Sequence, residues 1–139
     1  MSFLLDTNVV SEWMKPSPNP GVVTWLAEVD EDQVFLSVVT LTELRYGIER
    51  MATGRRRKRL NVWLQDEIPM RFEGRILSID REVADGCGKL VARSEAVGRP
   101  IEAMDAYIAA TAEAHQLTLV TRNARHFQPV LKAILSPWT

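Results

Sequence analysis

Three carboxylates in this chain, Asp6, Glu43 and Asp105, stand at places where chemistry is expected. Asp6 directly follows the short apolar run Phe3 to Leu5, and the other two lie at comparable junctions. A short apolar run bounded by turn residues is typical of a buried parallel strand, and open α/β sheets bind ligands outside the carboxyl ends of such strands. We therefore expect the three acids to meet at one edge of a sheet.

Converging carboxylates repel one another, which raises at least one pKa unless a cation neutralises the cluster. Mg²⁺ and Mn²⁺ are hard ions that prefer oxygen ligands, and Mg²⁺ keeps several waters while using a few carboxylates and substrate phosphates. Metal-activated water attacking a phosphodiester is the simplest chemistry for such a set. The candidate catalytic and metal-ligating residues are therefore Asp6, Glu43 and Asp105.

Each acid also has an ordinary structural explanation. Asp6 could cap a helix that begins near Val9, and the stretch from Thr40 to Glu43 has the pattern of a capping box. Asp105 falls in the first turn of a predicted helix, where the macrodipole favours negative charge by ~0.3–1 kcal/mol. The joint pattern favours a site, because Asp105 shares a helical face with apolar residues and an acid there needs a partner. Arg, Lys or a metal could be that partner.

The elements that must position these acids alternate between strands and helices. Apolar runs predict strands over 3–5, 34–37, 76–79, 118–121 and 133–135, and helical spacing lies between them. Asp80 is expected to cap a helix that Gly98 and Pro100 end, and a last long helix runs from about Glu102 to His115. This order predicts an α/β fold, a single domain over 1–139 built as a three-layer α/β/α sandwich around a central parallel sheet.

Composition limits the partners and the compartment. The 139 residues carry 17 Lys plus Arg against 18 Asp plus Glu, a net charge of -1, so nucleic acid binding needs a local basic patch. The single cysteine, Cys87, excludes an internal disulfide. No signal peptide is visible and no apolar run approaches the ~20 residues that span a bilayer, so we expect a cytoplasmic protein without a membrane contact.

One charge run could supply the basic patch. Five consecutive cations open a predicted helix whose later turns carry Leu60 and Trp63. Such a run is either a solvated helix face or a surface that contacts RNA phosphates or an acidic protein partner. The run comprises Arg55, Arg56, Arg57, Lys58 and Arg59.

The histidines and tryptophans do not indicate a further catalytic site. His115 and His126 lack partners at metal-ligand spacing, so zinc catalysis is not expected. Large aromatic residues are usually buried, so core or interface packing is favoured over base stacking for the four tryptophans. They are Trp13, Trp25, Trp63 and Trp138.

Four segments, in order and at suitable spacing, resemble the motifs of PIN-domain ribonucleases, specifically the VapC and FitB-like toxins of bacterial toxin–antitoxin pairs. They are Leu4 to Val9, Ser37 to Leu44, Asp105 to Ala112, and Leu119 to Asn123 with Phe127 following. The resemblance covers nearly the whole chain. It implies an Mg²⁺- or Mn²⁺-dependent endoribonuclease that forms a homodimer, is neutralised by a VapB-like antitoxin and cuts RNA in the bacterial cytoplasm.

By resemblance, Asp6, Glu43 and Asp105 would hold the metal, while Thr7, Asn8 and Thr121 would brace them through hydrogen bonds. The chain departs from the family at Asn123, where an acid is common. An amide oxygen can ligate Mg²⁺ but carries no charge, so the number of metal ions, one or two, stays open.

Two other functions compete with the ribonuclease. A degenerate PIN module would bind antitoxin and nucleic acid without cutting. A haloacid-dehalogenase-type phosphatase also opens with a strand and an aspartate, but it would have a second acid where Asn8 stands.

Overall fold

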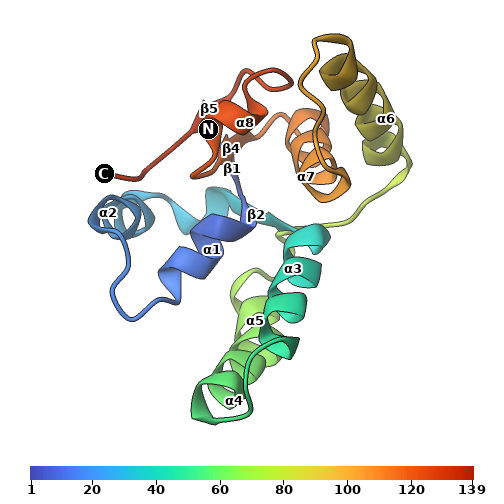
Figure 1. Ribbon diagram of the computed structural model, residues 1–139. Coiled ribbons are helices and arrows are strands. Elements are labelled where there is room, and N and C mark those ends of the chain that lie inside the picture. The colour runs from blue at the N-terminus through green and yellow to red at the C-terminus, as the bar shows by residue number, and fades with distance from the viewer.

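A five-stranded, all-parallel sheet forms the centre of the molecule (Figure 1). The computed structural model describes residues 1–139. The sheet order is β3-β2-β1-β4-β5, so the first strand lies in the middle. The strands are β1 (Phe3–Leu5), β2 (Val34–Ser37), β3 (Ile76–Leu77), β4 (Thr118–Val120) and β5 (Ile134–Leu135). The predicted parallel sheet is confirmed, and all five strands fall where apolar runs predicted them.

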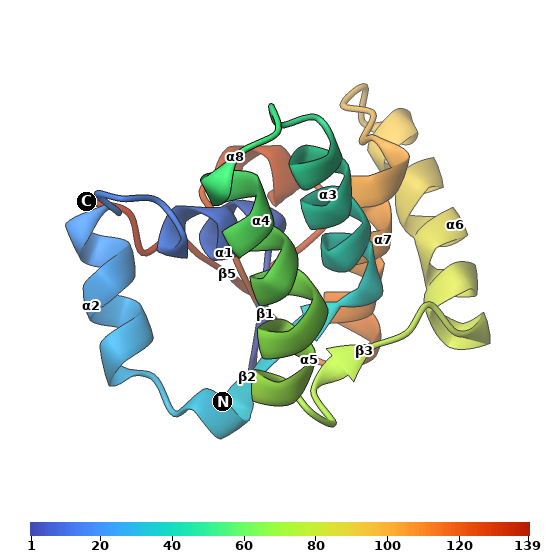
Figure 2. The same ribbon diagram turned by 90° about the horizontal axis from the view of Figure 1, so that it is seen from below.

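Helices cover both faces of the sheet and complete the predicted three layers (Figures 1 and 2). One face carries α6 (Arg81–Ala96), α7 (Ala103–Ala114) and the short α8 (Ala124–Phe127), which the sequence did not predict. The other face is covered by α1 (Thr7–Trp13), α2 (Pro20–Glu28), α3 (Val38–Glu49), α4 (Arg55–Val62) and α5 (Ile68–Arg71).

The apolar residues of the strands divide between two cores, one on each face. Leu4 and Leu119 belong to the core under α6 and α7, whereas Leu5 and Val120 belong to the core under α1 to α5. Successive strand side chains point to opposite faces, so a sheet buried on both sides needs an unbroken apolar run. This is why the strands have no polar alternation.

Helix α3 begins directly after β2, and its start corrects one alternative for Glu43. Ser37 is the N-cap, since its hydroxyl accepts the Val39 amide at 3.0 Å. Thr40 therefore lies inside the helix, and the capping-box explanation for Glu43 is wrong. Ser37 serves as the cap because it stands at the last position of the strand, where the first free helix amides need an acceptor.

The predicted limits of α6 are confirmed. The Asp80 carboxylate accepts the Val83 amide at 2.9 Å as the N-cap. Gly98 follows the helix with a φ of 72°, in the left-handed region that glycine adopts without steric cost.

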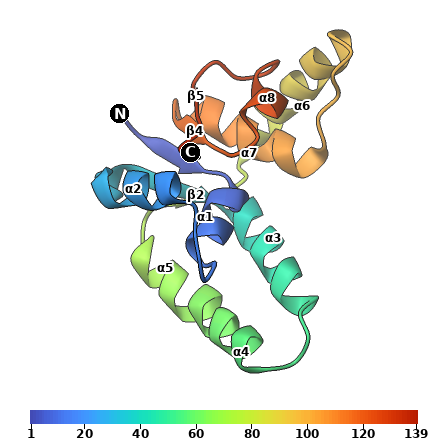
Figure 3. The same cartoon turned by 60° about the vertical axis from the view of Figure 1, so that its left-hand side comes forward.

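Helices α3 and α4 extend away from the sheet as an arm whose tip is the loop between them (Figure 3). Helix α4 continues through a π-helical turn at Trp63–Glu67 into α5. Pro69 stands at the start of α5 and lacks an amide hydrogen, which accounts for the break in regular hydrogen bonding. No helix is both long enough and apolar enough to span a bilayer.

Candidate functional site

Asp6 lies at the carboxyl end of the central strand, between β1 and α1. The register pairs Leu5 with Val120, and the Asp6 amide donates to the Val120 carbonyl at 2.9 Å. Thr121, the residue after β4, therefore lies beside Asp6 and donates its hydroxyl to Oδ2 at 2.7 Å. Asn8 donates to the same oxygen at 3.2 Å.

The Asp6 carboxylate also caps α1, because its Oδ1 accepts the Thr7 amide at 2.8 Å. Its side chain is buried, with 4% of the residue exposed. The helix-capping explanation for Asp6 is therefore correct. It is also compatible with a metal site, because one carboxylate has enough lone pairs to cap a helix and to bind a cation.

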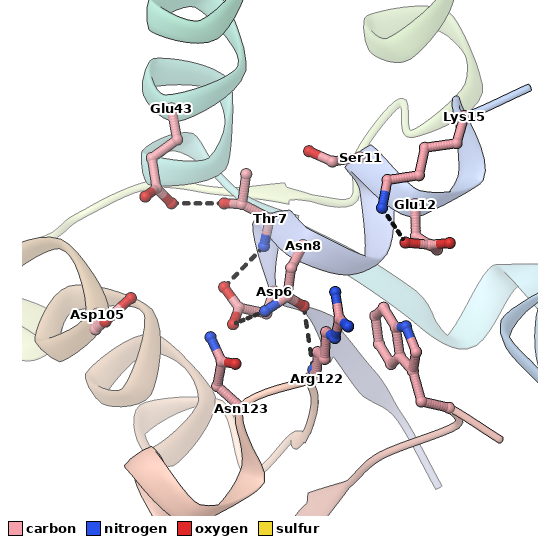
Figure 4. A pocket seen from close by; sticks show the side chains of 11 residues that line it. Asp6, Thr7, Asn8, Ser11, Glu12, Lys15, Glu43, Asp105, Arg122 and Asn123 are labelled. Atoms are coloured by element: carbon pink, nitrogen blue, oxygen red, sulfur yellow. Dashed lines mark hydrogen bonds and ion pairs between the residues drawn. The ribbon is translucent and has the colours of Figure 1, made fainter. Parts of the chain in front are cut away.

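Glu43 comes from the second turn of α3 and approaches Asp6 through Thr7 (Figure 4). The Thr7 hydroxyl lies 2.5 Å from Glu43 Oε1 and 3.0 Å from the hydroxyl of Thr40. This contact fixes the Glu43 carboxylate on the same side of α1 as Asp6.

Asp105 lies in the first turn of α7, on the opposite side of the group from α1. Its Oδ2 lies 3.1 Å from Nε2 of His126 on α8. The partner that this acid requires is thus a histidine for which the sequence indicated no role at the site. No local pattern reveals the pair, since the two residues are 21 positions apart on different helices.

The three acids line one cavity of about 360 Å³ at the carboxyl edge of the sheet, together with Asn8, Thr7 and Asn123 (Figure 4). A second cavity of about 710 Å³ adjoins it and shares Asp105, Arg122 and Asn123. The other side chains that line the first cavity were not predicted for the site. They are Ser11, Glu12, Lys15, Arg122 and Trp138.

Burial and repulsion from a neighbouring acid both act on Asp6 and Asp105. Burial raises the pKa of the Asp6 carboxyl above its ordinary 3.8, and the nearby Asp105 raises it further, while the Thr121 and Thr7 hydrogen bonds oppose the rise. Burial also raises the pKa of Asp105, with His126 opposing and Glu43 adding to the effect. Independently of these shifts, four acids and two cations line the cavity, so negative charge is in excess there, as it is in a cation site.

The sequence and the fold place the chain among known proteins. The PIN domain family model matches residues 3–130, and the Toxin FitB of Neisseria gonorrhoeae is 40% identical over 135 residues, 97% of each protein. The chain belongs to the PIN-domain toxin family of VapC and FitB. The VapC ribonuclease Y4jK of Sinorhizobium fredii is 35% identical over 97% of this chain and 96% of its own length. The structure of FitAB bound to an IR36 DNA fragment matches with a TM-score of 0.93 and 37% identity, over 99% of this chain and 96% of that one.

Membership of the PIN family confirms the resemblance drawn from the four motifs and removes the phosphatase alternative. The haloacid-dehalogenase hypothesis depended on the opening strand and aspartate alone. Asn8, which stands where the phosphatase would have its second acid, has its own hydrogen-bonding role in this chain. It donates to Asp6 and accepts the Arg122 amide at 3.2 Å, so it joins the first and last motifs.

The donor chemistry of the PIN cavity fits a hard divalent cation. Carboxylate, amide and hydroxyl oxygens line it, with no thiol among them. No three Asp, Glu, His or Cys side chains lie close enough together to hold one ion directly. Mg²⁺ keeps several of its waters in protein sites, so carboxylates that line a roomy cavity can hold it through them.

The remaining predicted residues lie at different distances from this cavity. Asn123 lines the cavity and is exposed, and its backbone amide donates to the Thr121 hydroxyl at 3.0 Å. None of the basic residues 55–59 lines either cavity, because they begin α4 at the tip of the arm (Figure 3). Within that run Arg57 has a structural role, donating to the Met51 carbonyl at 3.2 Å and pairing with Glu49 at 3.4 Å.

Proposed function

We propose that this chain is a metal-dependent endoribonuclease toxin that hydrolyses RNA phosphodiester bonds and is neutralised by a cognate antitoxin. The observation that carries the proposal is the cavity in which Asp6, Glu43 and Asp105 come from three separate elements. Gathering three acids destabilises a fold unless a cation or a positively charged ligand offsets their repulsion. The relatives named VapC ribonuclease and Toxin FitB support this activity and this biological role.

In this proposal Asp6, Glu43 and Asp105 hold Mg²⁺ or Mn²⁺, and Asn123 offers an amide oxygen. When bound, the metal supplies Lewis-acid activation of the phosphodiester and of the attacking water. No serine, cysteine or histidine nucleophile is required, so water is the nucleophile.

The side chains around the acids keep them in position. Thr121 and Asn8 fix the plane of the Asp6 carboxylate, and Thr7 fixes Glu43 through its hydroxyl. Such bracing matters because a displacement of about 1 Å at a catalytic group can cost ~100-fold in rate. His126 orients Asp105 in the same way.

The partners and the compartment are also proposals. FitB is seen with its partner in the FitAB complex on DNA, which supports a VapB-like antitoxin for this chain. We propose that a cationic side chain of the antitoxin tail enters the acidic cavity, that the toxin forms a homodimer, and that it acts in the bacterial cytoplasm.

The test is cleavage by the purified protein. Protein freed of antitoxin is incubated with total cellular RNA in Mg²⁺, in Mn²⁺ and in EDTA, and new RNA ends are sequenced. We expect discrete cuts that need the metal and that fall at least about 100-fold in Glu43→Gln, which keeps the side-chain size but removes a charge from the site. Glu82→Gln, an exposed acid on α6, is the matched control and should cut normally.

A non-cleaving PIN module remains the second candidate, because Asn123 stands where the family commonly has an acid. It predicts binding of RNA and antitoxin with no new RNA ends under any metal condition. The same sequencing experiment therefore decides between the two functions.

A further inference from the structure

One wall of the acidic cavity is aromatic. Trp138 is the only hydrophobic residue among the 11 that line the cavity. The indole is half-buried, packed against the core under α1 to α5. A flat apolar surface beside three acids contributes nothing to metal binding, so it needs another explanation.

The other three tryptophans pack away from the acids. Trp63 is buried, with 6% of the residue exposed. The edge of one ring in the Trp25 and Phe3 pair meets the face of the other at 5.1 Å between centroids, and Arg71 covers the Trp13 ring at 4.4 Å. These three match the expected core role. None of them lines the acidic cavity.

The segment that carries Trp138 is clamped onto the start of α2. Asn19, the N-cap of α2, donates to the Thr139 carbonyl at 3.1 Å and accepts the Thr139 amide at 3.2 Å. A Cβ atom at Gly21 would lie 2.2 Å from the Pro137 carbonyl oxygen, so only glycine lets the segment pack this closely. In the views of Figures 1 and 2 the C-terminal end accordingly lies beside α2.

The clamp is itself joined to the cavity wall. The Asn19 amide donates to Glu12 Oε2 at 2.8 Å, and Glu12 on α1 lines the cavity. The position of the indole is therefore fixed relative to α1, which follows directly from Asp6.

A cation accompanies the indole. The Arg122 guanidinium lies 5.8 Å from the centre of the Trp138 ring, and Arg122 is exposed and lines both cavities. The site thus has the three acids Asp6, Glu43 and Asp105 in one part of its lining and an arginine next to an aromatic ring in another. Proteins that bind single-stranded nucleic acid use this second combination, stacking bases on aromatic rings while cations contact the phosphates.

We propose that Trp138 is a base-stacking residue of this site: a nucleotide next to the cleaved phosphodiester lays its base on the indole and its phosphate against Arg122. The inference rests on the proposed RNA-cleaving function and adds base stacking to the core or interface packing expected for Trp138. Stacking on an aromatic ring is tolerant of sequence, so Trp138 contributes affinity and positioning rather than base identity.

The test measures binding with and without bases. The probes are fluorescently labelled oligoadenylate of about 12 nucleotides and a base-free ribose-phosphate oligomer of equal length and charge. Both are titrated in Mg²⁺ against protein carrying Asp105→Asn, so that no cutting interferes. Trp138→Leu keeps apolar packing but removes the flat ring, and it should weaken oligoadenylate binding by about 5- to 150-fold. Affinity for the base-free oligomer should stay unchanged.

Two further variants complete the design. Trp138→Phe retains a ring and should restore most of the oligoadenylate affinity. Gly21→Ala keeps Trp138 but forces the segment that carries it away from α2. This variant should therefore lose oligoadenylate affinity as Trp138→Leu does, with no change for the base-free oligomer. Thermal unfolding checks that each variant is folded.

The outcomes distinguish a failure of the base-stacking inference from a failure of the proposed ribonuclease function. If Trp138→Leu binds oligoadenylate as the parent does, or weakens both probes equally, Trp138 is structural and the inference fails while the ribonuclease proposal stands. If the parent protein binds neither probe, both the inference and RNA as the substrate are overturned.

Discussion

Burial, a neighbouring acid and a histidine act together on Asp105. Burial and Glu43 raise its pKa, and His126 opposes them. At neutral pH without metal, the ionised form is therefore held at a cost in stability.

Asp105→Asn should raise the melting temperature of the metal-free protein by about 1–3 °C while abolishing cleavage, because it removes a charge from a repelling group. In the parent, Asp105 has a higher pKa in the folded state than in the unfolded state, whose pKa is about 3.8. Protonated Asp105 therefore contributes to folding stability below pH 3.8, and this contribution is lost as the pH rises through the folded-state pKa. The difference in melting temperature between Asp105→Asn and the parent should thus widen as the pH rises from 3.8 through the folded-state pKa, and it should narrow toward pH 3.8.

Calorimetry in EDTA across this pH range makes the measurement. A variant that melts below the parent at neutral pH would show that the His126 contact outweighs the repulsion. Native cleavage by the variant would remove Asp105 from the ligand set.

Asn123 contributes an uncharged amide to the proposed metal site, where an acid would add a negative charge. Asn123→Asp should tighten Mn²⁺ binding by about tenfold, because it adds a carboxylate beside three others. Isothermal titration with Mn²⁺ measures the change. Asn61→Asp on α4, whose amide oxygen accepts from Arg45 at 2.6 Å, is a matched control and should not alter Mn²⁺ affinity. Unchanged titration of Asn123→Asp would place residue 123 outside the coordination sphere.

At the scale of elements, α4 contains the basic run but holds it away from the cavity. Arg55, Arg56, Lys58 and Arg59 are exposed at the tip of the arm, whereas Arg57 ties the tip to α3 (Figure 3). If the run contacts RNA, a strand that reaches the cavity must also extend along the arm.

Replacing Arg55, Arg56 and Lys58 with Gln should weaken RNA binding and reduce its salt dependence by ~0.7 in slope for each RNA phosphate that the variant no longer neutralises. Fluorescence anisotropy at several salt concentrations gives the slope, and Mn²⁺ affinity should stay constant. Arg57→Gln is the informative comparison, since it should lower thermal stability and leave the slope nearly unchanged. An unaltered slope in the triple variant would assign the run to a solvated helix face or to an acidic protein partner.

At the scale of the whole molecule, two cores share the strands of one sheet, so we propose that residues 1–139 fold as a single domain. Several large apolar side chains nevertheless remain exposed, among them Tyr46 at 62% and Met70 at 76%. Single exposed apolar residues are common on protein surfaces and do not by themselves identify an interface.

The protein should sediment as a dimer at micromolar concentration, because the family resemblance implies a homodimer. Analytical ultracentrifugation of antitoxin-free protein is the measurement, and dilution should shift the population toward monomer according to mass action. A monomer throughout the micromolar range would contradict the proposed homodimer and leave only the antitoxin complex as an assembly.

Local sequence patterns predicted the five strands and the limits of α6, but they missed α8 and placed the start of α3 at the wrong residue. The apolar runs identify the strands because a sheet buried on both faces requires them, and Asp80 and Gly98 mark the ends of α6 because caps depend on adjacent backbone groups. The same local logic placed Asp6 at the end of a strand.

Which distant side chains meet was visible only in the folded chain. Thr121 reaches Asp6 across 115 positions because the β1 and β4 register fixes it there, and His126 reaches Asp105 because a short unpredicted helix places it beside that acid. Trp138 joins the cavity because Asn19 and Gly21 hold its segment. Periodicity and capping report the backbone within a few residues, whereas these contacts depend on the packing of whole elements, which no local pattern records.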